Sequence, residues 1–338
     1  MRLAWLNSQD IRYGRAFGYT RAIEELRAAF VRAGGVLDPD AEVTFTFNNP
    51  DRYVKQPGSF SILYTMYENP DLPPHYRYAV REPDLVIVPS RFCRDVFQPY
   101  VASPVEVVPL GVDVQAFPGT IRPRVAYSRG KKFRWLWVGA ADQRKGWEEV
   151  RDAWRYAPPG GRALQDDPTC EIVFKTTSAG GDHEQPVRAG NAMIEPRSLS
   201  HADLLALYTS ADAFVFPSRG EGWGLTALEA FATGLPCVMT LARGVLDYAD
   251  ESVCIPVKHH PWEMVIANDY PAPMIRADVP DLANKMRWVM GHWNQARKIG
   301  LAAHRRAQHF TWDAAGRKLL DVLRRRCPSA ASAASPGA

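Results

Sequence analysis

The sequence predicts an α/β protein made of two doubly wound, Rossmann-like halves. Three observations indicate this fold class. The chain has 338 residues, which is long for one average domain and suits two. Short apolar runs alternate with segments of helical periodicity, as in βα units around parallel sheets. A stretch rich in proline, glycine and basic residues, at 111–132, separates two series of such units.

The first series contains five apolar runs of strand length. Between the first two runs, over 16–32, apolar residues recur at helical spacing, which predicts a helix. These elements form an expected N-terminal domain over 1–120, followed by a linker over 121–132. The expected strands are Leu3–Leu6, Val43–Phe47, Ser61–Tyr67, Leu85–Val88 and Val105–Val108.

The second series forms an expected C-terminal domain over 133–310. Its predicted strands are Trp135–Val138, Glu171–Lys175, Ala213–Phe216, Cys237–Met239 and Val253–Ile255. Its predicted helices are Gly146–Tyr156, His201–Thr209, Gly224–Thr233, Pro280–Gly291 and Asn294–Gln308. A last helix over 311–326 is expected to return to the N-terminal domain. The tail over 327–338 lacks large apolar residues and is expected to be disordered.

Composition narrows the classes of protein. The net charge is only +4, and acidic and basic residues are nearly balanced in the first 130 residues, whereas nucleic-acid binders usually carry a basic face. The N-terminus turns polar too early for a signal peptide, and no apolar run approaches the ~18–20 residues of a membrane span. We therefore expect a cytoplasmic protein without stable membrane insertion, at most peripheral at the inner membrane face.

Cysteines and histidines form no metal-site pattern. The cysteines have neither zinc-ligand nor redox spacing, so buried free thiols are expected. The adjacent pair His259-His260 is interpreted as part of a loop. The five cysteines are Cys93, Cys170, Cys237, Cys254 and Cys327.

The segment Ala213–Thr240, AFVFPSRGEGWGLTALEAFATGLPCVMT, is the most informative part of the sequence. A buried strand leads into a turn in which Gly220, Gly222 and Gly224 let the backbone approach a ligand closely. A helix then starts near Gly224, and its first amides form an anion site.

Two carboxylates accompany this anion site. Glu221 stands just before the helix and Glu229 lies within it, and eight residues at helical rise would place them about 12 Å apart. That span suits two carboxylates that hold the two ends of a sugar-diphosphate-ribose. The alternative is an ordinary βα turn with solvated glutamates, and the combination of glycines, acids and helix terminus favours the ligand site.

Glu221–Glu229 matches the Glu-x7-Glu motif of glycosyltransferase family 4, and EGWGLTALEAFATGLPCV resembles that family's signature. The resemblance implies a GT-B fold, with two Rossmann-like domains facing a cleft, and retaining transfer from a nucleotide diphosphate sugar. It implies that Glu221 contacts the donor sugar and Glu229 the ribose hydroxyls. Sugar and phosphates would meet the backbone of Gly222, Trp223, Gly224, Leu225 and Thr226.

A second matching segment is WLWVGAADQRKGWEEVRDAW, over Trp135–Trp154. In the family an arginine after the glycine and a lysine in Arg-Lys-Gly contact the donor diphosphate. Lys145 matches the lysine, but Ala140 stands in place of the arginine. Arg144 is a candidate to supply the missing charge.

The N-terminal half resembles the family more loosely. VIVPSRFCRDVF and VEVVPLGVDVQAF resemble the segment that closes the family's first domain. Tyr67 and Glu68 are placed near the acceptor by the resemblance. Gly14 and Gly18 are candidates for a turn over the diphosphate, with helix packing as the alternative for Gly18. The resemblance covers roughly residues 60–325.

Other enzyme classes fit the sequence less well. The glycines match neither G-x-G-x-x-G nor a Walker A pattern. Asp38-Pro39-Asp40 matches the D-x-D of metal-dependent transferases, but it lies in a short turn before a strand, and three-residue motifs arise by chance. Most tryptophans lie at core spacings, with Trp223 in the glycine turn as the exception.

The sequence therefore predicts a retaining, metal-independent hexosyltransferase that uses a UDP- or GDP-sugar and needs no cofactor. Lys145 and the helix amides would stabilise the departing diphosphate, which would take the acceptor's proton. The expected acceptor is a saccharide or lipid-linked saccharide. Two alternatives stay open: a transferase that acts on a hydroxylated DNA base, and a nucleotide-sugar-binding protein without turnover.

Overall fold

The computed structural model describes residues 1–6, 17–117, 132–176, 185–267 and 270–327. The chain forms two compact units. Unit 1 contains Met1–Gly111 and the chain from Phe310 onward, and unit 2 contains Val112–His309. None of the described helices has the length and apolar content that crossing a membrane requires.

Unit 1 contains a six-stranded, fully parallel sheet in the order β2-β1-β3-β4-β5-β6. Strands β3 and β5 are buried along their whole length, as expected for a sheet with both faces covered. The strands are β1 (Arg2–Leu6), β2 (Val36–Leu37), β3 (Val43–Phe47), β4 (Phe60–Tyr64), β5 (Leu85–Val88) and β6 (Glu106–Val107). The helices are α1 (Phe17–Arg32), α2 (Pro74–Ala79), α3 (Arg91–Phe97) and α9 (Trp312–Arg326).

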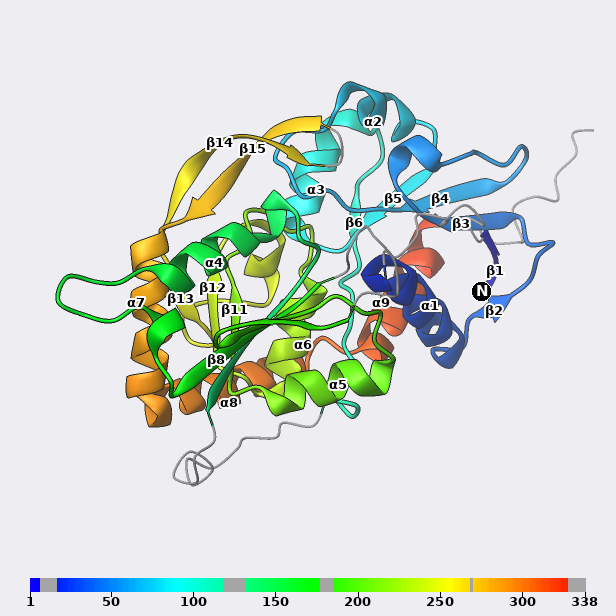
Figure 1. The fold of residues 1–338 in the computed structure, drawn as a ribbon. Coiled ribbons are helices and arrows are strands. Elements are labelled where there is room, and N and C mark those ends of the chain that lie inside the picture. The colour runs from blue at the N-terminus through cyan, green and yellow to red at the C-terminus, as the bar shows by residue number, and fades with distance from the viewer. Residues whose placement is uncertain (7–16, 118–131, 177–184, 268–269, 328–338) are drawn as a thin grey trace, which may run out of the picture. The chain divides into compact units, whose positions relative to one another are not determined.

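Helix α9 brings the far end of the described chain into unit 1, where it packs against α1 (Figure 1). The two helices approach closely because Gly316 has no side chain: a Cβ there would lie 2.3 Å from the carbonyl oxygen of Ala29. At the edge of the contact, Arg32 Nε donates to Asp313 Oδ1 at 2.7 Å. Leu319 and Leu323 are fully buried, so α9 is part of the core of unit 1.

Unit 2 contains a seven-stranded sheet in the order β13-β12-β11-β7-β8-β10-β9, parallel except for β9. Its strands are β7 (Phe133–Val138), β8 (Cys170–Lys175), β9 (Val187–Ala189), β10 (Ala192–Glu195), β11 (Ala213–Phe216), β12 (Cys237–Thr240) and β13 (Ile255–Val257). Its helices are α4 (Trp147–Arg155), α5 (His201–Ser210), α6 (Leu225–Thr233), α7 (Val279–Gly291) and α8 (Trp293–Ala307).

The two faces of this sheet are covered by different helices. On one face, Trp135 and Trp137 of β7 pack with residues of α4 and α7 in a single apolar cluster. On the other face, Tyr208 of α5 stacks on Phe214 of β11, with ring centroids 5.7 Å apart. Ligands of such sheets bind at the carboxyl ends of the strands, which makes the loops after β7, β8 and β11 the candidate region.

A two-stranded antiparallel ribbon stands out from this sheet (Figure 1). It consists of β14 (His259–Ala267) and β15 (Tyr270–Ala277). The interpretation of His259-His260 as a loop is therefore wrong, because the pair begins β14. Within the described chain the ribbon pairs with no other strand.

Several predicted strands differ from the structure in their bounds, and β4 and β13 are two of them. Strand β4 ends at Tyr64, three residues earlier than the apolar run suggested, and β13 begins at Ile255 and not at Val253. The predicted free thiols are present as such: four cysteines are buried, and Cys327 is half-buried. The predicted linker and tail lie almost entirely outside the described residues.

Candidate functional site

The glycine turn, residues 217–224, joins the buried strand β11 to helix α6. Gly224 precedes the helix with φ 89°, a left-handed conformation that favours glycine. Its carbonyl oxygen accepts from the Tyr248 hydroxyl at 2.8 Å, and that hydroxyl would lie only 2.9 Å from a Cβ at this position. The turn therefore leads directly into the N-terminus of α6. The first backbone N–H groups of a helix have no partner within the helix and point outward from its amino end.

A second loop is held tightly against the glycine turn. It contains the 3-10 turn Gln143–Lys145, which is capped by Asp142 and followed by Gly146 at φ 68°. A Cβ on Gly146 would meet the carbonyl oxygen of Pro217 at 2.1 Å, so only glycine permits this approach. The backbone N–H of Arg219 donates to the carbonyl oxygen of Arg144 at 2.8 Å.

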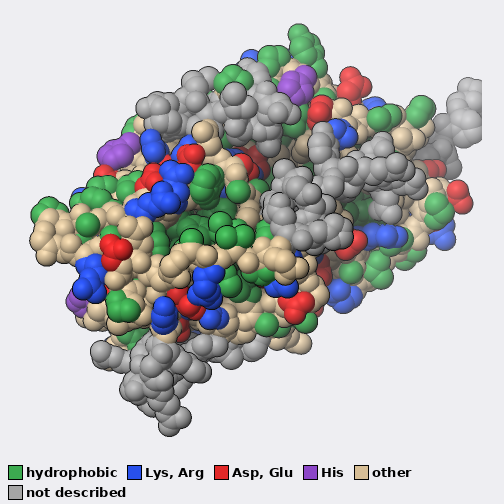
Figure 2. Space-filling view, viewed as in Figure 1, with side chains coloured by type: hydrophobic (Ala, Val, Ile, Leu, Met, Phe, Trp, Pro, Cys, Tyr) green, Lys and Arg blue, Asp and Glu red, His purple; other side chains and the backbone are tan. Residues whose placement is uncertain are grey.

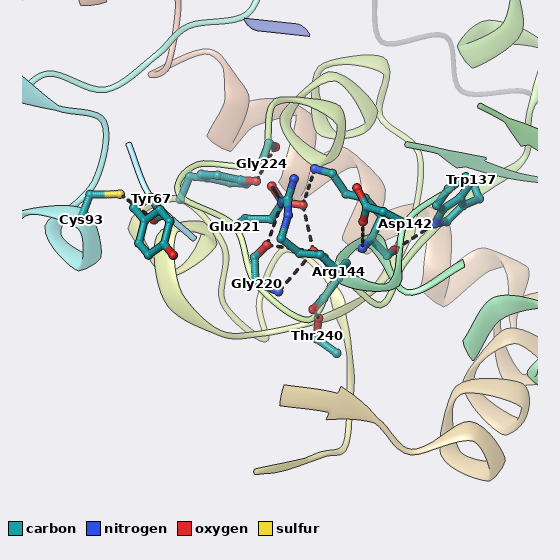
Figure 3. A network of polar contacts seen from close by, with 12 residues as sticks. Tyr67, Cys93, Trp137, Asp142, Arg144, Gly220, Glu221, Gly224 and Thr240 are labelled. Atoms are coloured by element: carbon teal, nitrogen blue, oxygen red, sulfur yellow. Dashed lines mark hydrogen bonds and ion pairs between the residues drawn. The ribbon is translucent and has the colours of Figure 1, made fainter. Parts of the chain in front are cut away.

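These two loops bring Glu221 together with two cations (Figure 3). Lys145 Nζ donates to Glu221 Oε1 at 2.7 Å, and Arg144 Nη1 donates to Glu221 Oε2 at 3.3 Å. The Ser218 hydroxyl donates to the same carboxylate at 2.8 Å. Burial alone would raise the pKa of Glu221, but Lys145 and Arg144 outweigh it and hold that pKa below its ordinary value.

Arg144 also links the cluster to the backbone of the turn. Its Nη1 donates to the carbonyl oxygen of Gly220 at 3.0 Å, and Figure 3 shows the side chain extending toward Gly220 and Glu221. Both cations thus face the same carboxylate at the amino end of α6. An anion that arrives there meets two positive side chains and the helix amides together.

Glu229 lies eight residues after Glu221 in the sequence, within α6. Its Oε2 accepts from the Tyr208 hydroxyl of α5 at 2.9 Å, and that hydroxyl also lies 3.1 Å from the carbonyl oxygen of Thr226. Only the chain from Leu225 onward is helical, so the separation of about 12 Å estimated from helical rise does not describe the path from Glu221 to Gly224.

The structure corrects the interpretation of Trp223. Its indole is only 1% exposed and packs on Tyr248, with ring centroids 5.2 Å apart. Trp223 is therefore a core residue that supports the turn, and only its backbone can meet a ligand. Gly222 is buried, whereas Leu225 and Thr226 are partly exposed at the start of α6.

The N-terminal candidates belong to unit 1. Tyr67 is buried in a core cluster and makes an edge contact with Tyr76. Glu68 is half-buried. Gly18 lies in the first turn of α1, and Gly14 lies outside the described residues.

Two further predicted positions have clear local structures. Ala140 is exposed just after β7. Asp38 Oδ1 accepts from the Asp40 amide at 3.1 Å, and Asp38 pairs with Arg2 at 3.2 Å, which is the turn expected from the sequence. Among the described residues, no group of three or more histidine, cysteine, aspartate or glutamate side chains is arranged to hold a metal ion.

No sequence pattern indicated the residues that position this cluster. Arg219, 3% exposed, donates to the fully buried Glu149 of α4 through Nη2 at 2.6 Å. Arg276 of β15 donates to the same carboxylate oxygen at 2.9 Å. In addition, the Ile275 amide donates to the carbonyl oxygen of Arg219. A buried carboxylate thus connects α4, the glycine turn and the ribbon, through residues that are far apart in the sequence.

Comparison with known proteins identifies the family. Residues 91–319 match the model of a family described as family 4 glycosyltransferases in conflict systems. The chain belongs to this family. The predicted membership of glycosyltransferase family 4 is confirmed by this match.

Curated relatives match over most of the chain. The MMP α-(1→4)-mannosyltransferase of Mycolicibacterium hassiacum is 28% identical over 253 residues, which cover 73% of this chain and 55% of the relative. The glycogen synthase of Mycobacterium tuberculosis is 30% identical over 243 residues, which cover 70% and 52%. The chain spans about half the length of the curated relatives it matches.

Solved structures show the same fold at low sequence identity. The Anabaena protein Alr3699/HepE, crystallised with UDP and glucose, has a TM-score of 0.68 and 13% identity, over 96% of this chain and 100% of that one. The sucrose-phosphate synthase of Thermosynechococcus elongatus has a TM-score of 0.62 and 17% identity, over 91% and 78%. The predicted GT-B fold, with two Rossmann-like α/β halves, is confirmed.

Proposed function

We propose that this chain is a retaining glycosyltransferase that moves a hexose from a UDP- or GDP-sugar to a hydroxyl group. One observation carries the proposal: Lys145 and Arg144 converge on Glu221 at the amino end of α6, with Glu229 further along the same helix. Family membership supports it, as do relatives that are named as mannosyltransferase and glycogen synthase. The structural neighbour crystallised with UDP and glucose supports the donor class.

The charges suggest how the chain would treat such a donor. Without a ligand, the carboxylate of Glu221 pairs with both cations and leaves one net positive charge. A diphosphate at the amino end of α6 would attract Lys145 and Arg144 away from Glu221, which would then face the sugar. As the glycosidic bond breaks, the diphosphate gains negative charge, and the two cations and the helix amides stabilise it. In this scheme the cations do the work of a metal, so transfer is metal-independent.

We propose a saccharide or lipid-linked saccharide as the acceptor. A hydroxylated DNA base is the alternative. On the face drawn in Figure 2, the described Lys and Arg side chains are interspersed with Asp and Glu and do not form one continuous basic surface. Backbone phosphates attract a protein through clustered Lys and Arg, so this face favours the saccharide.

Thermal unfolding tests the donor site. UDP or GDP at about 100 times its dissociation constant is expected to stabilise the folded state by about 2.7 kcal/mol, which raises the melting temperature by several degrees. UMP and uridine, which lack the diphosphate, should give a smaller rise. Melting curves that no nucleoside diphosphate moves would contradict the proposed function.

Turnover separates an enzyme from a binding protein. A panel of UDP- and GDP-sugars is incubated with the protein, and slow hydrolysis or transfer is measured with and without EDTA. Activity that persists in EDTA supports the metal-independent mechanism. Nucleotide binding without turnover on any sugar or acceptor, modified DNA included, would favour the binding protein. Activity that EDTA abolishes and manganese restores would instead support a metal site at Asp38 and Asp40.

A further inference from the structure

A buried lysine at the end of β8 has no role in the site described above. Lys175 is the last residue of β8 and is 6% exposed. Within the described part of the chain its ammonium makes one hydrogen bond, to the carbonyl oxygen of Thr176 at 2.7 Å. An ammonium has three N–H donors, and buried donors without acceptors are costly. Two of its donors therefore have no acceptor among the described residues and are available to a ligand.

The side-chain hydroxyl of the next residue, Thr176, also lacks a hydrogen-bond partner within the described chain. Its Oγ1 is buried, while the Thr176 amide donates to the carbonyl oxygen of Glu195. Glu195 lies opposite Lys175 on the paired strand β10, and its charge attracts the ammonium. Within the described residues no hydrogen bond joins the two groups, because Arg197 holds Glu195 through Nε at 2.8 Å and Nη2 at 2.6 Å. Burial accordingly lowers the pKa of Lys175.

Strand geometry places Lys175 on the face that carries Glu229. Phe174 packs against the cluster beneath α4 and α7, so the next residue, Lys175, points to the opposite face of the sheet. That face holds α5, whose Tyr208 is bonded to Glu229 of α6. Lys175 therefore lies at the carboxyl edge of the sheet, on the side where Glu229 would hold the ribose.

The strand order sets how far Lys175 lies from the diphosphate end of the site. Strand β7 separates β8 from β11, which leads into the glycine turn. Two strand spacings correspond to roughly 9–10 Å. A nucleoside diphosphate whose phosphates lie at the amino end of α6 would extend its nucleoside over this distance.

We propose that Lys175 and Thr176 form the nucleobase subsite of the donor site and select an oxo base, uracil or guanine, over adenine. The inference rests on the proposed function and specifies its donor. An ammonium offers only donors, which match the carbonyl oxygens on the edges of uracil and guanine, whereas adenine presents an amino group at the corresponding position.

Nucleotide titrations of Lys175→Met test the subsite. Calorimetric dissociation constants are measured for UDP, GDP, ADP and inorganic pyrophosphate, which contains only the phosphates. The wild type is expected to prefer UDP or GDP to ADP. Lys175→Met should lower the affinity for the preferred nucleotide by about 10- to 100-fold and leave the affinities for ADP and pyrophosphate nearly unchanged. Lys175→Arg, which keeps the donors, should recover part of the preference.

Controls separate the possible outcomes. Lys258→Met removes an exposed lysine of unit 2 and should change no affinity. Ligand-free Lys175→Met should melt at or above the temperature of the wild type, because the loss of a buried charge removes a desolvation cost. An equal loss of affinity for all four ligands would show that Lys175 contacts the phosphates. Unchanged affinities would show that Lys175 lies outside the donor site. Either result overturns the proposed subsite. A wild type that binds no nucleotide overturns the proposed function itself.

Discussion

Glu221 and Glu229 are both carboxylates of one motif, yet their surroundings differ. Glu221 is buried and shares its two oxygens among Lys145, Arg144 and Ser218. Glu229 is half-buried and accepts from Tyr208. The first is therefore tied to the cations that would bind a diphosphate, and the second is placed for hydroxyl groups.

Glutamine substitutions should separate the two roles. Glu229→Gln is expected to lower the affinity for UDP and GDP by about 10- to 100-fold, because a charged acceptor of ribose hydroxyls becomes a neutral one. Glu221→Gln should leave the affinity for the bare nucleotide unchanged or higher, since Lys145 and Arg144 lose their competing carboxylate. It should lower kcat, because a neutral amide no longer stabilises positive charge on the sugar.

Titration of UDP and GDP into both variants checks this prediction, together with kcat on the active sugar donor. The two substitutions are matched, because each removes one charge and keeps the shape of the side chain. Loss of nucleotide affinity in Glu221→Gln with full affinity in Glu229→Gln would show that the assigned orientation is reversed.

The sequence predicted the participants of this site better than their contacts. Glu221, Lys145 and Glu229 were identified from motif spacing, but spacing alone does not show that Lys145 pairs with Glu221 from 76 positions away. Trp223 was misinterpreted because a residue inside a glycine turn can still point its side chain into the core, and only the fold reveals its contact with Tyr248.

At the scale of elements, the five predicted strands and the helices of unit 2 followed their sequence patterns, whereas β9, β10 and the ribbon were not predicted. Pro261, Pro271 and Pro273 lie within β14 and β15, and proline argues against a strand in a sheet interior. A two-stranded ribbon has two edges, where a proline costs no ladder hydrogen bond. The sequence pattern therefore did not predict the ribbon, because its prolines argue against strands although an isolated hairpin tolerates them.

The base of the ribbon is tied to the glycine turn through Glu149. This carboxylate is fully buried and joins Arg219 of the turn to Arg276 of β15. Glu149→Gln should destabilise the protein by about 3–5 kcal/mol, the usual cost of breaking a buried pair on one side. It should also lower kcat, because Arg219 lies two residues before Glu221.

Glu148→Gln is the matched control for this prediction. Glu148 is the preceding residue of α4 and also accepts from Arg219, at 3.0 Å, but its side chain is 27% exposed. The partly exposed carboxylate of Glu148 is screened by solvent, and pairs screened in this way contribute about 0–1 kcal/mol, so this variant should melt close to the wild type. Chemical unfolding of both variants decides the matter, and equal losses of stability would contradict the special role of Glu149.

At the scale of the whole molecule, unit 1 is assembled from the two ends of the described chain. Helix α9 begins at Trp312, after the whole of unit 2, yet it packs on α1 through Gly316. Helical periodicity predicted α9 as an element. Its close approach to Ala29 depends on a single missing side chain and could not be predicted from the pattern.

Two Gly→Ala substitutions should test whether this approach holds unit 1 together. Gly316→Ala would place a Cβ 2.3 Å from the carbonyl oxygen of Ala29, so α1 and α9 must separate, at an expected cost of about 1–3 kcal/mol. Gly291→Ala, at the end of α7, meets nothing within 4 Å and should stabilise the protein by up to about 1 kcal/mol. Denaturant unfolding measures both changes. UDP affinity should survive in Gly316→Ala, since the nucleotide residues belong to unit 2, and a Gly316→Ala variant as stable as the wild type would show that the two helices tolerate a wider separation.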